Sequence, residues 1–533
     1  MSAPSRISPV APNLTAPEAD GFEPTRLIGA ILLAIVAVRL LTLGAYPLGS
    51  TTEPRYAEIA RKMLETGNWV TPWFDHGVPF WGKPPLSFWG SAATMGLLGV
   101  NEFAARLAPF LAAMGTAALF WAWPREPVSR AALPLAASVV MLSTVVGFIA
   151  SAAVMTDMFM TLGTTLCMVA FWVAWSDPTG RNPWRWLFFV GLAMGLMAKG
   201  PVATVITGLA LGLWAIAGRG RIRLAWQCLP WLRGALLTLV LTAPWYLLAE
   251  QRTPGFLAYF IVGEHFERFT VSGWTGDLYG QGHAEPRGLI WWFGFGGFLP
   301  WTLVAMLALV LLWRRGAMDA AGHGSDGSAG MGKPFLKATE WQYLMAWTVA
   351  PLLFFTAARN ILEAYVLPGL PAFALLTALL GLAAARRATW FSWLWLLGLV
   401  CPVLWAGWLM VSEQPELRSQ RALVRLWKAD SPLVYLGDRP LSANFYALGR
   451  AAVVDQPDDI RRWLASREPV TLVLQDTVRK SLTAQELAGW RIVATHAGYT
   501  MLGRAADVTV DNPPDPAVQA SLNKTTPRKQ ISP

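Results

Sequence analysis

The sequence contains few charged residues and few cysteines. Only 14% of its 533 residues are charged, whereas 54% are hydrophobic, a balance that excludes an ordinary soluble domain. The three cysteines, Cys167, Cys228 and Cys401, lie in or beside apolar segments, and their number is odd. They therefore indicate packing residues, without a disulfide framework and without the spacing of a metal site.

Two repeat patterns are also missing from the sequence. No period of about 20–50 residues recurs along the chain. No pair of matching helices broken by Gly or Pro occurs in two halves, which would be the sign of an inverted-repeat transporter.

The net charge is +10, yet the basic residues form no continuous stripe of the kind that binds nucleic acid. These absences weaken a transport function and exclude nucleic acid as an expected partner.

Long apolar runs are what the sequence does have, among them 27–43, 131–150 and 289–313. A helix needs roughly 20 apolar residues to span a membrane, and we expect about 11–13 such helices. The polar residues 1–26 precede an apolar run that has no small-residue cleavage site. We therefore expect a disordered cytoplasmic tail followed by an uncleaved first helix.

Basic residues cluster in alternate short loops, and this pattern predicts the orientation of the chain. The positive-inside rule places these clusters in the cytoplasm. The N-terminus is then cytoplasmic and the C-terminal segment extracytoplasmic, in a multi-pass protein of the cell inner membrane. The clusters are Arg125 with Arg130, Arg181 with Arg185, Arg219 with Arg221 and Arg223, Arg314 with Arg315, and Arg386 with Arg387.

The expected fold is an all-α polytopic membrane domain with juxtamembrane helices in the first outer loop, plus a small C-terminal α/β domain. The membrane domain covers 27–411, with outer loops at 44–101 and 250–287 and a Gly/Ser-rich cytoplasmic linker at 314–340. The periplasmic α/β domain covers 412–510, and a disordered tail covers 511–533.

Short β-branched runs and two helical patterns are the evidence for the C-terminal domain. The runs are "SPLVYLG", "AAVVDQ" and "VTLVLQD", and the helices are expected at 458–466 and 484–490.

Ionisable residues outside the cytoplasmic clusters gather on the predicted outer face. Residues 54–65 have apolar side chains at helical spacing with charges between them, which predicts an amphipathic helix on the membrane surface. Charged groups at membrane depth are costly, so Asp157 and Lys199 should line a wet or paired cavity. Lys83, where the chain re-enters apolar sequence, suits a lipid phosphate. For each residue alone, interfacial snorkelling is the competing interpretation.

At these motifs the sequence resembles a known family. It is similar to the integral-membrane glycosyltransferases that include lipid A aminoarabinose transferases and, more distantly, protein O-mannosyltransferases. The resemblance covers residues 27–385. It rests on "TEPRYAEIARKMLETGNW", "GKPPLSFW", "NEFAARLAP", "AVMTDMFMT", "LMAKGPV", "GEHFERF" and "YVLPGLPAFALL", which occur in this order.

The resemblance implies an outward cavity, a polyprenyl-phosphate sugar as donor and inversion at the sugar carbon. The acceptor would be a lipid (lipid A-like), a glycan or a protein outside the cytoplasm, with membrane lipids as further partners. A carboxylate must take the acceptor proton, and cations or a divalent metal must meet the departing phosphate.

Candidate residues for these roles follow from the motifs. Glu53 is expected to be the general base, and Asp157 is the second catalytic carboxylate. His265 is a candidate metal ligand, a proton relay or a hydrogen-bonded interfacial histidine. The residues expected to bind the donor phosphate or sugar are Arg55, Tyr56, Lys83, Lys199, Arg268 and Tyr365.

The sequence departs from the family pattern at three places. Most relatives carry an Asp-Glu pair where this chain has Thr52 and Glu53. Aminoarabinose transferases tend to carry Glu at the position of Gly82 and Lys at the position of Ile361. These losses put in doubt both a bound metal and aminoarabinose as the sugar. A transporter or flippase of a lipid-linked sugar, or a non-catalytic relative, are the alternative functions.

Overall fold

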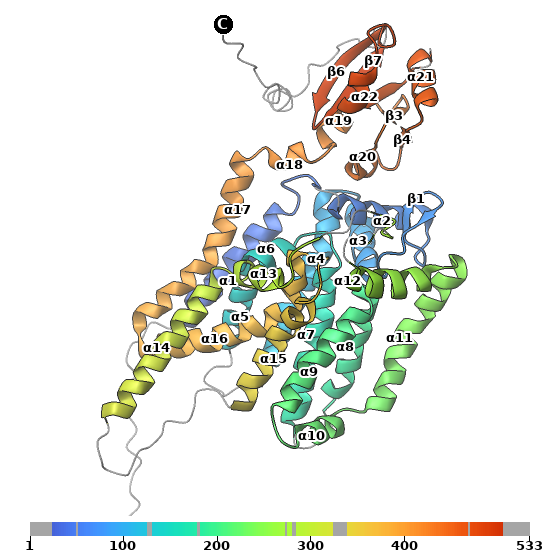
Figure 1. Cartoon of the computed structure of the whole chain (residues 1–533). Helices are drawn as coiled ribbons and strands as arrows, with labels where there is room; N and C mark the ends of the chain where they lie inside the picture. The colour runs from blue at the N-terminus through green and yellow to red at the C-terminus, as the bar shows by residue number, and fades with distance from the viewer. Residues whose placement is uncertain are drawn as a thin grey trace, which may run out of the picture.

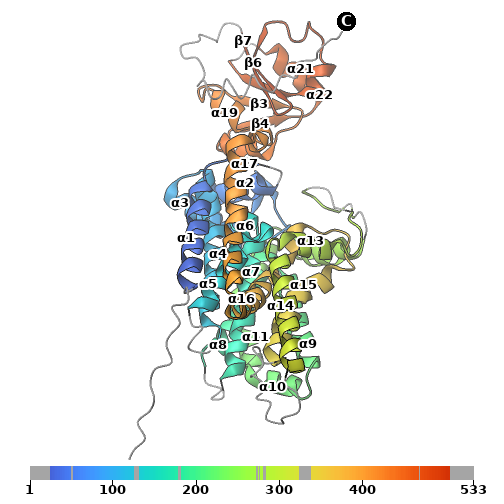
Figure 2. The same cartoon turned by 90° about the vertical axis from the view of Figure 1, so that its left-hand side faces the viewer.

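A computed structural model describes residues 24–49, 52–124, 131–177, 182–271, 274, 276–279, 284–322, 338–466 and 469–504. The predicted tail 511–533 lies outside these residues, as do residues 1–23 of the predicted tail 1–26 and residues 323–337 of the predicted linker. Helices form a bundle, and the C-terminal segment with its sheet lies at one end of it (Figure 1). In both cartoon views α17 leads to that segment, while α10 lies at the opposite end (Figure 2).

The described part of the chain contains six helical segments that are long and apolar enough to cross a membrane. A seventh span would be a pair of helices bent by 84° at 298–300. Three shorter apolar helices accompany them, so the expected 11–13 spans are not reached by long helices alone. The fold class expected from the sequence, a polytopic helical domain followed by a small α/β domain, is confirmed.

The helices of the membrane domain follow one another with short connections. They are α1 Pro24–Thr42, α2 Thr52–Thr66, α3 Leu86–Leu98, α4 Glu102–Leu119, η1 Phe120–Ala122, α5 Ala132–Ser143, α6 Val145–Ala150, α7 Asp157–Ser176, α8 Trp184–Lys199, α9 Pro201–Ile216, α10 Arg221–Cys228, α11 Trp231–Arg252, the π-helix η3 Ala258–Glu267, α12 Arg268–Thr270, α13 Leu289–Gly297, α14 Trp301–Gly322, α15 Ala338–Phe355, η4 Glu363–Gly369, α16 Leu370–Arg387, η5 Thr389–Leu399 and α17 Val400–Val411. Because α14 continues to Gly322, the predicted linker 314–340 begins inside a helix.

Helices α7 and α8 approach each other closely, and glycines make this contact. A Cβ atom on Gly163 would lie 2.8 Å from the backbone nitrogen of Gly195, and one on Gly191 would lie 2.7 Å from the carbonyl oxygen of Gly163. Small residues let membrane helices approach at backbone distance. The two antiparallel helices therefore hold the first residue of α7, Asp157, beside the last residue of α8, Lys199.

The C-terminal domain is a five-stranded mixed sheet with helices. Its strand order is β4-β3-β5-β7-β6, with β3 parallel to β4 and β5, and β7 antiparallel to β5 and β6. The three predicted β-branched runs form β3, β4 and β5. The elements are α18 Gln414–Leu417, α19 Arg421–Leu426, β3 Leu433–Leu436, α20 Leu441–Tyr446, β4 Ala451–Val454, α21 Pro457–Ala465, β5 Thr471–Gln475, α22 Asp476–Ser481, β6 Trp490–His496 and β7 Tyr499–Arg504.

One predicted helix of this domain is wrong. The helix at 458–466 is present as α21, but 484–490 forms turns that end in β6. Gly489 has a φ of 87°, which is a left-handed conformation that stops a helix and turns the chain into the strand.

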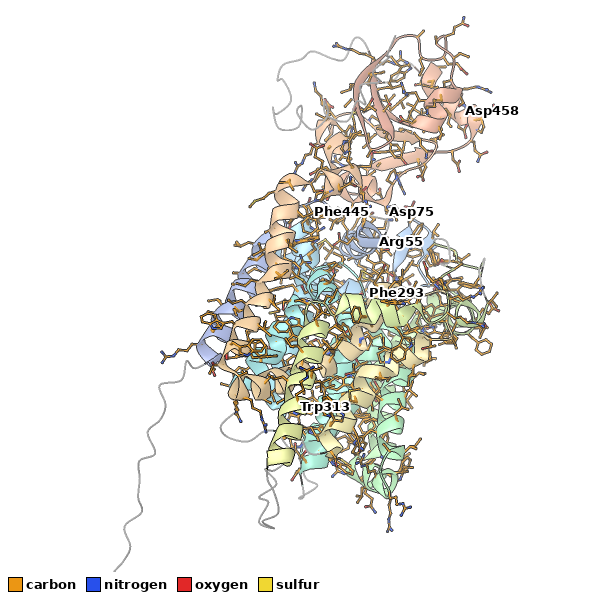
Figure 3. The ribbon with its side chains drawn as sticks, turned by 60° about the vertical axis from the view of Figure 1, so that its left-hand side comes forward. Arg55, Asp75, Phe293, Trp313, Phe445 and Asp458 are labelled. Atoms are coloured by element: carbon orange, nitrogen blue, oxygen red, sulfur yellow. The ribbon has the colours of Figure 1, made fainter. Side chains whose placement is uncertain are left out.

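The amphipathic helix expected at 54–65 is present as α2, but it does not lie exposed on a membrane surface. Glu58 and Lys62 have no exposed surface and Arg61 is 5% exposed. A short hairpin, β1 Trp73–Asp75 with β2 Val78–Pro79, and the C-terminal helix α20 cover them. Figure 3 shows Asp75 and Phe445 near Arg55, where the C-terminal domain meets the helices.

Ion pairs and hydrogen bonds join α2 to these covering elements. Glu58 accepts hydrogen bonds from Arg61 at 2.7 and 2.9 Å and from the side-chain amide of Asn444 at 2.8 Å. Lys62 donates to the carbonyl of Phe74 at 2.7 Å and pairs with Asp75 at 3.3 Å.

A second contact ties the C-terminal domain to the rest of the first loop. Arg439 pairs with Asp75 at 2.5 Å, and Arg421 pairs with Glu102 at 2.9 Å. Arg439 and Lys62, with their positive charge, hold the pKa of Asp75 below its usual value, although burial acts in the opposite direction. The C-terminal domain is therefore docked on the first loop and on the start of α4 by paired charges that are partly buried.

We expect Glu58→Gln to loosen this docking, because it removes the one fully buried carboxylate that Arg61 and Lys62 share and leaves them only the more exposed Glu65 and Asp75. Breaking a buried ion pair costs about 3–5 kcal/mol. Thermal unfolding and limited proteolysis of the purified protein should show a lower midpoint and earlier release of the C-terminal domain. Glu65→Gln is the matched control, since Glu65 lies on the same helix, contacts Arg61 and is 43% exposed. Equal behaviour of the two variants would contradict this account.

Candidate functional site

A cavity of about 150 Å³ lies where the loop before α3 and the end of α8 meet α9, η3, α12, α15 and η4. Charged and polar side chains share its wall with apolar ones. The lining residues are Lys83, Lys199, Pro201, Val202, Val205, Glu264, His265, Arg268, Phe269, Phe354, Phe355, Asn360 and Tyr365. The structure thus brings together five of the residues named from the sequence, Lys83, Lys199, His265, Arg268 and Tyr365, from segments far apart in the chain.

Lys83 and Arg268 meet on one carboxylate in this cavity. The Lys83 Nζ atom lies 2.9 Å from Glu264 Oε2, and Arg268 Nη1 lies 3.0 Å from both Glu264 oxygens. Burial acts to raise the pKa of Glu264, but Lys83 and Arg268 outweigh it and hold the pKa below its usual range. Glu264 is therefore ionised at neutral pH and carries a negative charge between the two cations.

Asp157 and Lys199 form an ion pair beside this cluster. Asp157 accepts a hydrogen bond from the Lys199 ammonium, and the ammonium nitrogen lies 4.2 Å from the centre of the Tyr365 ring. All three residues line a small hollow that adjoins the main cavity through Lys199 and Tyr365. The predicted paired cavity for Asp157 and Lys199 is present.

The turn after Lys199 explains the motif "LMAKGPV". Gly200 has a φ of 85°, and a Cβ atom there would lie 2.6 Å from the Phe260 ring. Pro201 then begins α9 at a position where its missing N–H costs nothing. The turn leaves the Lys199 carbonyl 3.1 Å from His265 Nε2, so the Gly-Pro pair positions both residues of the cavity wall.

Tyr56 and Arg55 approach the same cluster from α2. The hydroxyl of Tyr56 is buried, and burial raises its pKa, whereas the positive charge of Arg55 lowers it. The nearby Asp157, Glu264 and Tyr365 raise this pKa further. The Nε atoms of Arg55 and Arg268 are both buried and have no hydrogen-bond partner among the described residues. Two guanidinium groups thus keep donors for a further acceptor.

Glu53, the expected general base, has different contacts. It accepts two hydrogen bonds from Arg106, at 2.9 and 2.8 Å, and one from the backbone nitrogen of Val154 at 3.3 Å. Arg106 is fully buried and also donates to the carbonyls of Leu43, Tyr46 and Pro47. Glu53 does not line the cavity. The Glu53 carboxylate is thus bound to Arg106, whereas the Asp157 carboxylate lines the hollow beside the cavity; the role of Glu53 as a base stays a prediction.

The residues of this site do not fit a divalent metal. His265 Nδ1 lies 2.7 Å from the Phe260 carbonyl and its Nε2 lies 3.1 Å from the Lys199 carbonyl, so both ring nitrogens face oxygen atoms of the protein. Within the described ranges, no three His, Cys, Asp or Glu side chains could hold a metal ion together. The carboxylates Asp157 and Glu264 are each occupied by cations of the chain.

The sequence did not single out Glu264 or the apolar part of the wall. Glu264 stands in the quoted motif "GEHFERF", four residues before Arg268, and this helical spacing was the available signal. Val205, Phe269 and Phe354 come from three separate helical segments, so no local pattern could have grouped them.

The fold and the cavity define a polytopic membrane protein with a charged chamber at the end of the bundle that carries the C-terminal domain. Residues 25–260 match the family model described as dolichyl-phosphate-mannose-protein mannosyltransferase. An undecaprenyl phosphate-alpha-4-amino-4-deoxy-L-arabinose arabinosyl transferase of Erwinia tasmaniensis is 31% identical over 65% of this chain and 58% of its own length. The transferase of the same name in Aeromonas hydrophila is 30% identical over 71% and 65%, respectively.

The fold is similar to a solved structure as well. ArnT from Cupriavidus metallidurans in the apo state has a TM-score of 0.69 at 20% identity, covering 90% of this chain and 98% of that one. The structure of ArnT bound to undecaprenyl phosphate has a TM-score of 0.67. The resemblance to integral-membrane glycosyltransferases is therefore confirmed. The chain spans about 58% of the length of the first curated relatives that it matches.

We expect Glu53→Gln to lower stability and to leave ligand binding in the cavity unchanged. The change removes the charge that neutralises the buried Arg106, at a cost of about 3–5 kcal/mol in the free energy of unfolding. Thermal unfolding in detergent measures this loss. A variant that keeps the parent's unfolding midpoint but loses turnover by a hundredfold or more would return Glu53 to the role of general base.

Proposed function

We propose that this chain is a glycosyltransferase of the cell inner membrane that transfers a sugar from a polyprenyl-phosphate donor to an acceptor on the extracytoplasmic side. The observation that carries this proposal is the convergence of Lys83, Lys199 and Arg268 with Asp157 on adjoining hollows at one end of membrane-spanning helices. The family model and the curated relatives, whose names include dolichyl-phosphate-mannose and undecaprenyl phosphate substrates, support it.

The cations of the cavity suit the phosphate of such a donor. Lys83 offers a point charge, and Arg268 offers a planar guanidinium whose buried Nε atom has no partner among the described residues. Val205, Phe269 and Phe354, on the apolar side of the cavity, suit the first isoprene units. As the bond between the sugar and the phosphate breaks, the phosphate gains negative charge, and these cations stabilise that charge.

Asp157 is the proposed general base. A hydroxyl of the acceptor attacks the sugar carbon, its proton passes to the Asp157 carboxylate, and polyprenyl phosphate leaves with the electron pair of the broken bond. Attack from the side opposite the phosphate inverts the sugar carbon. The ammonium of Lys199 donates a hydrogen bond to Asp157 and so holds its carboxylate at the wall of the hollow.

Reconstituted protein tests the function as a whole. Vesicles that contain the chain are incubated with a labelled polyprenyl-phosphate sugar and with lipid A-like, glycan and protein acceptors. Label on an acceptor supports a transferase and identifies the acceptor class. Label that crosses the bilayer without transfer would indicate a transporter, and label that is only bound would indicate a non-catalytic relative.

For Asp157→Asn we expect donor binding within a fewfold of the parent and turnover lower by about a hundredfold or more, because the proton has no acceptor. Single-turnover assays and donor binding are measured on the same preparation, with thermal unfolding as a check on folding. Asp177→Asn, at the opposite end of α7, is the matched control. Normal turnover in a folded Asp157→Asn protein would remove Asp157 from the proton transfer.

The proposed orientation has its own test. The basic cluster of Arg219, Arg221 and Arg223, at the start of α10, lies at the end of the bundle opposite the C-terminal domain, which agrees with the positive-inside rule (Figure 1). A reporter that is active only outside the cytoplasm, fused after Arg504, should be active. Activity of a cytoplasm-only reporter at that position would place the cavity in the wrong compartment for this function.

A further inference from the structure

Glu264 is the most enclosed charged side chain of the cavity, with 4% of its side chain exposed. It accepts from Lys83 at 2.9 Å and from Arg268 at 3.0 Å, and the Tyr259 hydroxyl lies 3.4 Å from its Oε1. Arg268 has only one other acidic neighbour within 4 Å among the described residues, Asp277 at 3.6 Å. The two cations best placed for a phosphate are therefore both directed at one carboxylate of the chain itself.

We propose that Glu264 is an internal counter-ion that competes with the phosphate of the donor and of the product for Lys83 and Arg268. This inference rests on the proposed function in assuming that the cavity receives a phosphate. A carboxylate and a phosphate offer the same kind of oxygen to ammonium and guanidinium groups. A phosphate that enters must share these donors with Glu264 or displace it, and Glu264 can take them back as the phosphate leaves.

The competition has a consequence for turnover. Two cations in a site that excludes much of the water would hold a dianionic phosphate strongly, and slow release of product limits many enzymes. A carboxylate 2.9 Å from one cation and 3.0 Å from the other weakens that hold. It also keeps the cations in place before the donor arrives.

Whether phosphate binding tightens or weakens when Glu264 is neutralised distinguishes a competing counter-ion from a purely structural residue. If Glu264 competes with phosphate, its neutralisation tightens phosphate binding. If Glu264 only holds Lys83 and Arg268 in position, its neutralisation lets them move and weakens binding. Asp157 and Lys199 neutralise each other in the adjoining hollow and remain in both cases.

The experiment measures binding of radiolabelled farnesyl phosphate, a short polyprenyl monophosphate, to the full chain in lipid nanodiscs. For Glu264→Gln we expect a Kd at least about tenfold lower than in the parent, since a like charge is removed from a partly buried site. Lys83→Ala should raise the Kd. Glu267→Gln is the matched control, because Glu267 lies on the same helix η3 but is exposed and bonded to Trp274 at 3.1 Å. Its Kd should stay within about twofold, as expected for an exposed charge.

Equal or weaker binding in a Glu264→Gln protein with the parent's unfolding temperature overturns the inference, as does the absence of farnesyl phosphate binding in every variant. If Glu264→Gln does not fold, Glu264→Asp provides the second test. Its carboxylate is one methylene further from the cations, so binding should tighten by about two- to threefold. No tightening in Glu264→Asp overturns the inference as well.

Sugar transfer is assayed separately from binding. A parent protein that transfers no sugar, while Glu264→Gln still lowers the Kd, contradicts the proposed function and supports the role of Glu264 as a counter-ion.

Discussion

The burial of three charges on one turn of α2 constrains the rest of the structure. Glu58, Arg61 and Lys62 are removed from water, and an unpaired charge there would cost more than the helix could recover by packing. Their partners come from the β1–β2 hairpin and, almost 400 residues away in sequence, from Asn444. The C-terminal domain therefore completes the first loop, and through α2 it fixes the place of Arg55 and Tyr56 beside the cavity.

A second constraint acts from inside the membrane domain. The glycines of α7 and α8 allow contact between backbones, and this contact fixes the ends of the two helices to each other. Asp157 and Lys199 meet there as a pair that a looser contact would separate. The site thus depends on the packing of glycines between α7 and α8 and on the paired charges between α2 and the elements that cover it.

The sequence could predict the parts of the site that lie in local motifs. Lys83, Lys199, Arg268 and Tyr365 each stand in a short recognisable stretch, and all of them line the cavity. Pairing between distant segments could not be predicted, because no local pattern records it. The place of Glu53 in its motif predicts a base, whereas the motif says nothing of its hydrogen bond with Arg106, fifty-three residues later.

This chain has Gly82 directly before Lys83, at the position where aminoarabinose transferases tend to carry Glu. The structure shows that a distant residue supplies an acidic partner for Lys83 instead. A Cβ atom on Gly82 would lie 2.9 Å from the ring of Phe80, so a larger residue at 82 would require that ring to move from its packing against Tyr56 and Phe88. Lys83 nevertheless has an acidic partner, since Glu264 reaches it from η3. The ammonium of Lys83 is therefore neutralised from a distant helix, and Glu264, unlike a residue next to Lys83, also pairs with Arg268 and so offsets the charge of both cations at once.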